Sequence, residues 1–142
     1  MVMWIRILCC GALLLSCGTS DEVDCSSLAN PDIGLELVYP RGGETLTLGR
    51  FAAVEWKADP GKMSSVVLAV SINGSTGPWR NILSREMTVP GGGAVVCMDT
   101  VWVPGDEYDA VGYSAGTTVL LRVCSSTDER YCDESGMISI ER

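Results

Sequence analysis

Apolar and polar residues alternate with a period of two along much of the chain after residue 32. The clearest case is 52–59, where every second residue is apolar and the residues between them are mostly charged. This period is typical of a strand that buries one face in an antiparallel sheet. Trp56 is the largest side chain on the apolar side, and we expect the other strands, including the one that carries Trp102, to pack around it.

Further segments repeat the alternation or form short apolar runs, and turn signals separate them. One signal is Asn73-Gly74, a dipeptide typical of tight turns between strands. The predicted strands are 33–39, 52–59, 66–72, 79–89, 94–103, 117–124 and 137–141. About seven short strands without an amphipathic helix predict an all-β fold, an immunoglobulin- or fibronectin-like antiparallel β-sandwich, with a small closed barrel as the alternative.

The chain has 142 residues, enough for one domain, with a formal net charge of −8 and no histidine. The negative charge argues against a nucleic-acid partner and against electrostatic attachment to anionic lipid. The missing histidine removes the usual general base, the usual zinc ligand and the usual pH switch. We therefore expect neither an enzyme nor a resident cofactor or metal.

The first residues have the composition of an export signal. One positive charge, at Arg6, precedes an almost wholly apolar stretch from Ile7 to Leu15 that is too short to span a membrane as a stable helix. It ends in Leu14-Leu15-Ser16-Cys17, which resembles the cleavage box of bacterial lipoprotein precursors. That resemblance implies cleavage before Cys17 and a membrane anchor of several acyl chains on this residue. The alternative is an ordinary secretory signal that leaves Cys17 as a free thiol.

This interpretation divides the chain into a signal peptide at 1–16, a tether at 17–31 and an immunoglobulin-like β-sandwich domain at 32–142. The tether is rich in serine, aspartate, asparagine and glycine, and it has no apolar period. The predicted location is the bacterial cell envelope. Gly18 follows the predicted lipidation site, where an aspartate is associated with inner-membrane retention in enteric lipoproteins, so we expect the outer membrane or the cell surface.

Seven cysteines are present, two of them within the predicted signal. Those that remain outside the signal and the lipidation site are Cys25, Cys97, Cys124 and Cys132. An even number in an oxidising compartment predicts two disulfides, for which three pairings are possible. We expect Cys124 to pair with Cys132 across a short polar loop between strands, which leaves Cys25 with Cys97 to hold the tether on the sheet. The alternative, a metal site of four thiolates, lacks the usual Cys-x-x-Cys spacing.

A series of short motifs spans 35–141. In chain order they are Pro40-Arg41-Gly42-Gly43, Gly49, Val54-Glu55-Trp56, Asn73-Gly74, Val101-Trp102-Val103-Pro104, Asp133-Glu134-Ser135 and Ile138-Ser139-Ile140. Their order and spacing resemble the amino-terminal immunoglobulin-like domain of fungal cell-wall glucan-synthesis proteins and Ser/Thr-rich GPI-anchored proteins, which also occurs in bacterial surface proteins. The resemblance implies a β-sandwich, a role in wall polysaccharide assembly and no catalytic residues. The added cysteines and the bacterial-style anchor depart from that family, so a fungal glucan role is not carried over.

One motif of catalytic type is present. Gly112-Tyr113-Ser114-Ala115-Gly116 fits Gly-x-Ser-x-Gly, the nucleophile turn of α/β-hydrolases. That turn needs a preceding strand, a following helix and a histidine base, whereas here a loop precedes, a strand follows and histidine is missing. A serine–lysine pair would need Lys57 or Lys62 beside Ser114, and no pattern places either there. We expect the glycines to serve a turn.

Carboxylates cluster within 106–109 and 128–134, and clustered carboxylates are typical ligands of calcium. No twelve-residue calcium-loop pattern is present, so we interpret both clusters as solvated surface. Asp133 and Ser135 are also expected to hydrogen-bond the backbone near the start of the last strand.

Four aromatic residues lie in or beside predicted loops with polar neighbours. They are Trp79, Tyr108, Tyr113 and Tyr131. Aromatic side chains in such places stack on sugar rings or anchor protein partners, so all four are candidate ligand-binding residues. The alternative is that Trp79 and one or two of the tyrosines cap the core.

The predicted function is a lipid-anchored, non-enzymatic envelope module that binds cell-wall polysaccharide or a protein partner. The first alternative is a structural accessory subunit of a surface assembly, with edge strands as contact sites. A small serine hydrolase is the alternative from another class, and the missing histidine disfavours it.

Overall fold

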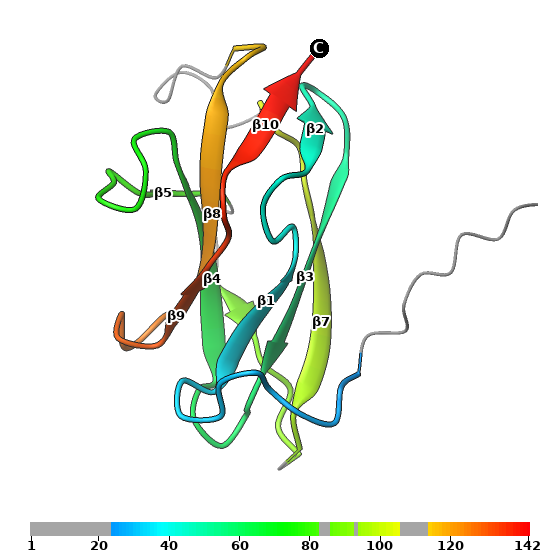
Figure 1. Cartoon of the computed structure of the whole chain (residues 1–142). Helices are drawn as coiled ribbons and strands as arrows, with labels where there is room; N and C mark the ends of the chain where they lie inside the picture. Colours follow the sequence, from blue (N-terminus) through cyan, green and yellow to red (C-terminus); the bar gives the residue numbers. More distant parts are fainter. Residues whose placement is uncertain (1–23, 83–85, 93, 106–113) are drawn as a thin grey trace, which may run out of the picture.

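The computed structural model describes residues 24–82, 86–92, 94–105 and 114–142. Two β-sheets pack face to face (Figure 1). The strands are β1 (Leu35–Tyr39), β2 (Thr45–Thr47), β3 (Ala52–Ala58), β4 (Ser65–Ser71), β5 (Arg80–Asn81), β6 (Met87–Thr88), β7 (Val96–Trp102), β8 (Thr118–Ser125), β9 (Cys132–Glu134) and β10 (Ile138–Glu141). The described residues contain no helix, and the predicted all-β sandwich is confirmed.

The first sheet has the strand order β1-β3-β7. The second sheet has the order β2-β10-β8-β4-β5, with β6 also beside β4 and β9 also beside β8. Among the described strands, only the pair β2–β10 is parallel, and the other pairs are antiparallel. The alternation did not predict β2, which forms where the chain crosses from the first sheet to the edge of the second.

The crossing begins at a tight corner after Pro40. Gly42 has a φ of 122°, a conformation that residues with a side chain rarely adopt. A Cβ atom on Gly42 would lie 2.6 Å from the Cα atom of Gly136, just before the last strand. The amide of Gly136 donates a hydrogen bond of 2.6 Å to the carbonyl of Arg41. Glycine is therefore required at position 42 because the two chain segments touch there.

Two segments differ from the predicted strands. The single weak strand expected at 79–89 is two short strands, β5 and β6, which pair with opposite ends of β4. Residues 132–134, which lie outside the predicted strands, form β9 along β8. Aspartate and glutamate disfavour strands locally. The pairing with β8 and the Cys124–Cys132 disulfide hold this segment extended nonetheless.

The core lies between the two sheets. Trp56 and Trp102 are 1% and 2% exposed, as predicted. The other large residues buried with them include Leu35, Leu37, Val54, Val66, Leu68, Val70, Val119, Leu121, Val123, Ile138 and Ile140. Each of these lies on the inward side of its strand, so burial of one apolar face per strand drives the two sheets together.

Asp133 and Ser135 hydrogen-bond the backbone, as expected, although they reach β1 and β8 rather than the start of the last strand. The Asp133 carboxylate accepts hydrogen bonds from the amide of Leu37 at 2.8 Å and from the guanidinium of Arg41 at 2.7 Å. The Ser135 hydroxyl accepts one from the amide of Leu121 at 2.9 Å. Because Leu37 lies in the first sheet and Asp133 in the second, the Asp133 contacts link the two sheets.

Both predicted disulfides are present. Cys124 and Cys132 are bonded across the β8–β9 hairpin, with a sequence separation of 8. Cys25 and Cys97 are bonded with a separation of 72, which holds the segment around Cys25 on the outer face of the first sheet. The predicted lipidation site, Cys17, and the signal at 1–16 lie outside the described residues.

The segment after Cys25 covers part of the first sheet. The Lys57 ammonium donates to the carbonyl of Ser27 at 3.2 Å and lies 3.6 Å from the Glu36 carboxylate. That carboxylate also accepts from the amide of Ala29 at 2.8 Å. Lys57 points away from the core, as its place in the alternation predicts, yet it is only 8% exposed because this segment lies over it. No helix long and apolar enough to cross a membrane occurs in the described ranges.

Candidate functional site

A hollow of about 260 Å³ lies on the outer face of the second sheet, over β4 and β8. We call it the outer-face hollow. Short side chains form its floor, and longer polar side chains stand around them. The residues that line it are Val67, Ala69, Asn81, Glu86, Arg122, Cys124, Ser125, Ser126 and Glu129. A concave surface on which several polar groups converge is the usual form of a ligand site.

The floor follows from the alternation along β4. Its outward residues Val67 and Ala69 are short, and the strand register places them opposite Cys124 and Arg122 of β8. On the other side of β4, Asn81 of β5 lies opposite Ala69. Neighbouring side chains on one face of a sheet are close enough to form a continuous surface. A short residue between two longer ones therefore leaves a depression.

Arg122 lines this region, and Trp79 lies behind it against its guanidinium. The guanidinium of Arg122 lies over the indole ring of Trp79, with its central carbon 4.3 Å from the ring centroid. The indole N–H donates to the carbonyl of Ser75 at 3.3 Å, which fixes the ring in the loop before β5. The Nε atom of Arg122 is buried and has no hydrogen-bond partner among the described residues. The stack thus holds a cation at the hollow and leaves one of its donors unused.

Two serines position the Glu86 carboxylate at the margin of the hollow. The hydroxyl of Ser65 donates to Glu86 at 2.8 Å, and the hydroxyls of Ser65 and Ser126 lie 2.5 Å apart. Glu86 itself is exposed. One oxygen of its carboxylate is therefore held by the wall while the group remains accessible to a ligand.

Glu129 comes from the turn of the β8–β9 hairpin, and an ion pair stabilises this turn. The Arg130 guanidinium lies 2.6 Å from the Asp128 carboxylate, and its side-chain hydrogen bonds lower the pKa of Asp128 from 3.8 to about 2. Asp128 also accepts from the backbone amide of Arg130 at 3.0 Å. These contacts fix the residues on both sides of Glu129.

The structure does not bring the four predicted ligand-binding residues together in one site. Trp79 lies next to the outer-face hollow, because its ring stacks on Arg122. Tyr131 is half-buried against the core instead, with the guanidinium of Arg130 6.0 Å from its ring centroid. Tyr108 and Tyr113 lie outside the described residues.

The sequence did not single out the polar residues around the hollow. They are Asn81, Glu86, Arg122 and Glu129. One signal was available, since Arg122 is the only charged residue within the apolar strand predicted at 117–124. Asn81 and Glu86 lie within the strand predicted at 79–89, and Glu129 lies within the carboxylate cluster interpreted as solvated surface, so only the fold brings them together.

The Gly-x-Ser-x-Gly motif is described only in part, from Ser114 onward. The Ser114 hydroxyl lies 3.1 Å from that of Thr117. Lys57 contacts Ser27 and Glu36, as described above, and the ammonium of Lys62 donates to two backbone carbonyls just before β1. These contacts do not bring either lysine to the serine. Within the described ranges, no group of three or more Cys, Asp or Glu residues is arranged to hold a metal ion.

The lipoprotein and immunoglobulin-like resemblances stay predictions, because they rest on motifs of this chain alone. No family model matches the chain, and no curated protein matches it either.

Proposed function

We propose that this chain is a lipid-anchored, non-enzymatic module of a bacterial cell envelope that binds wall polysaccharide through the outer-face hollow. The observation that carries this proposal is the set of polar groups around a short-chain floor beside a tryptophan. Arg122 offers only donors, and the ionised carboxylates of Glu86 and Glu129 offer only acceptors. Asn81 offers both.

Sugar hydroxyls suit this mixture because each hydroxyl both donates and accepts a hydrogen bond. An anionic ligand would meet the carboxylates of Glu86 and Glu129, and a cationic ligand would meet the guanidinium of Arg122. An uncharged ligand with many hydroxyls satisfies all three.

The size of the hollow favours one sugar unit at a time. At about 260 Å³ it is slightly smaller than the roughly 300–1,000 Å³ of sites that enclose a drug-sized ligand. The hollow lies on the outer face of a sheet, so a longer chain can continue beyond it. Trp79, at the margin, offers apolar surface to a neighbouring unit through the part of its half-buried ring that Arg122 leaves uncovered.

The proposal includes an immunoglobulin-like topology and a lipid anchor. If the longer strands take the letters of an immunoglobulin domain without its strand D, then β1, β3 and β7 correspond to A, B and E, and β4, β8 and β10 to C, F and G. That division between the sheets supports an immunoglobulin-like sandwich. The Leu14-Leu15-Ser16-Cys17 box supports the anchor, and the outer membrane or the cell surface is the proposed location.

The test is binding of the full chain to an array of bacterial wall polysaccharide fragments, followed by titration of the best ligand. We expect Arg122→Gln and Glu129→Gln each to weaken binding about tenfold, because each removes a charge-assisted hydrogen bond. Trp79→Ala should weaken binding as well, since Arg122 loses the ring on which it stacks.

Arg50→Gln is the matched control, because it removes an exposed arginine that does not line the hollow. It should leave the affinity unchanged. If no fragment binds, or if Arg122→Gln and Arg50→Gln have the same effect, the outer-face hollow is not a polysaccharide site.

A further inference from the structure

Among the residues that the structure describes, the first sheet ends in a long edge strand. β7 pairs with β3 on one side and is the last strand in the order β1-β3-β7. The short strand β6 pairs with β4 of the second sheet instead. An edge strand presents a row of backbone donors and acceptors that another extended chain can pair with, and natural proteins usually shorten or cover such edges. The stretch from Val96 to Val101 forms most of this edge.

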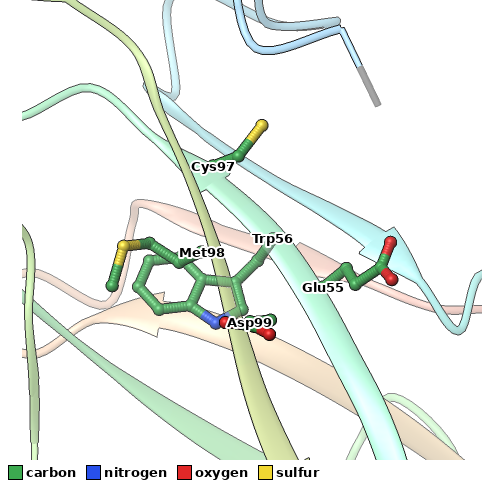
Figure 2. Close-up of a pocket in the computed structure, with 5 residues that line it drawn as sticks. All are labelled: Glu55, Trp56, Cys97, Met98 and Asp99. Atoms are coloured by element: carbon green, nitrogen blue, oxygen red, sulfur yellow. The ribbon is translucent and has the colours of Figure 1, made fainter. Parts of the chain in front are cut away.

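Two hollows flank β7 at the same point. One, of about 190 Å³, involves Glu55 of β3 and Asp99 of β7, which the register places opposite each other (Figure 2). The other, of about 380 Å³, includes Glu86 and residues of β6 and β7. On β3, Glu55 precedes the inward Trp56, and on β7, Asp99 follows the inward Met98. Because successive side chains of a strand alternate between faces, Glu55 and Asp99 are on the outward face. We therefore call the first the outward hollow and the second the inward hollow.

This placement matches the side-chain pattern of an added strand. Successive side chains of a strand point to opposite faces of the sheet. A segment paired with the free side of β7 would place one side chain on the outward face beside Asp99, at the margin of the outward hollow. Its neighbour would lie on the inward face beside Met98, at the inward hollow. Recognition by strand addition combines main-chain hydrogen bonds with pockets for alternate side chains in this way.

The charges around the two hollows favour a basic segment. Glu55 and Asp99 line the outward hollow, Glu86 lines the inward one, and no lysine or arginine is among the described residues that line either. A lysine or arginine of an added strand would lie beside Asp99, on the side away from β3, and the carboxylates of Asp99 and Glu55 would both attract it. A second copy of this chain fits poorly, because two antiparallel β7 edges centred on Asp99 would place like charges directly opposite each other.

The indole of Trp56 is an independent sign of an incomplete site. Trp56 lines both hollows, and its Nε1 is buried without a hydrogen-bond partner among the described residues. Figure 2 shows the side chain of Met98 beside this ring. Methionine is flexible and adapts to a ligand. A movement of Met98 would admit an acceptor atom of the added segment to the indole N–H, which is otherwise left unsatisfied.

We propose that the β7 edge receives an extended, basic segment of a partner protein as an added strand, with a lysine or arginine beside Asp99. This interaction surface shares only Glu86 with the residues that line the outer-face hollow. The module would then hold a protein partner at the edge of one sheet and polysaccharide on the face of the other.

The test is selection of a random heptapeptide library on the full chain, followed by titration of the enriched peptides. Enriched peptides should carry a lysine or arginine at one position, and they should protect the amides of β7 from hydrogen exchange. Asp99→Lys should weaken their binding about tenfold, since it turns an attraction into a repulsion. Alternate N-methylation of the peptide should abolish binding, because it removes the donors that pair with β7.

Glu141→Lys is the matched control, because it makes the same change of sign at an exposed position on β10. It should have little effect, and Arg122→Gln should have none, which separates this site from the polysaccharide site. Thermal unfolding of Asp99→Lys should match that of the unmodified chain, as expected for an exposed residue. The proposal is wrong if no peptide is enriched, if enriched peptides show no basic position, if N-methylation leaves binding intact, or if sedimentation shows two copies paired through β7.

Discussion

The outer faces of the two sheets follow the same alternation, but a chain segment covers part of one face, whereas the other face has an open hollow. On the first sheet, the outward Lys57 is 8% exposed, because the segment around Ser27 lies over it and Glu36 pairs with it. On the second sheet, the outward Val67 and Ala69 are short, and the longer side chains around them leave the outer-face hollow. The outward charge of the first sheet is thus covered. The short outward residues of the second sheet form the floor of a site that is surrounded by polar side chains.

The two disulfides account for much of this difference. The Cys25–Cys97 bond connects residues 72 apart and brings a polar segment onto a sheet with which that segment forms no strand pairs. The Cys124–Cys132 bond connects residues only 8 apart and closes a hairpin beside the hollow. The first bond decides what covers a face, whereas the second stabilises a turn that the strands already define.

The largest loss of stability is expected from removing the Cys25–Cys97 disulfide. Cys25→Ser with Cys97→Ser should lower the free energy of unfolding by about 4 kcal/mol, because the bond closes a loop of 72 residues. Cys124→Ser with Cys132→Ser should lower it by about 2–3 kcal/mol, because its loop spans only 8. Urea unfolding of the two double variants measures both values. Dithiothreitol should lower the melting temperature of the unmodified chain, and an unchanged value would count against both bonds.

A smaller loss of unfolding free energy is expected when the covered charge of Lys57 is removed. Lys57→Met should cost about 1–3 kcal/mol, because the Glu36 carboxylate loses its cation under the covering segment. Arg122→Met, on the other face, should cost less than about 1 kcal/mol, since a half-exposed guanidinium on an aromatic ring contributes little. Adding Glu36→Gln to Lys57→Met should restore part of the loss. Equal costs for Lys57→Met and Arg122→Met in urea unfolding would show that the two faces do not differ in burial.

The smallest effect is expected at the hairpin that carries Glu129. Arg130 lowers the pKa of Asp128 from 3.8 to about 2, so this pair stabilises the folded state fully above about pH 4. Its contribution is lost as the pH falls through about 2. In an NMR titration, Arg130→Gln should return the pKa of Asp128 toward 3.8. Because the Arg130 side chain is exposed to solvent, the variant should unfold at nearly the same urea concentration as the unmodified chain. A pKa that stays near 2 would assign the shift to the backbone amide alone.

Much of the fold was predictable because the period of two is a local property of the chain. It identified the inward positions of the main strands, including Trp56, Trp102 and Leu121, all of which are buried. The pairing of Cys124 with Cys132 followed from their closeness along the chain, and the other disulfide followed by elimination. Of the aromatic residues that were proposed as a ligand site and that the structure describes, Trp79 contacts a residue of the outer-face hollow, Arg122, whereas Tyr131 packs against the core.

The sequence by itself therefore determined which face of each main strand turns toward the core, since that depends on neighbours one and two residues away. Only the tertiary structure decided what lies on the outer faces. The hollow needs Ala69, Arg122 and Glu129 to meet, and the cover over Lys57 needs a bond between residues 72 apart. Strand register and long-range covalent links set these contacts, and neither is encoded in a local pattern.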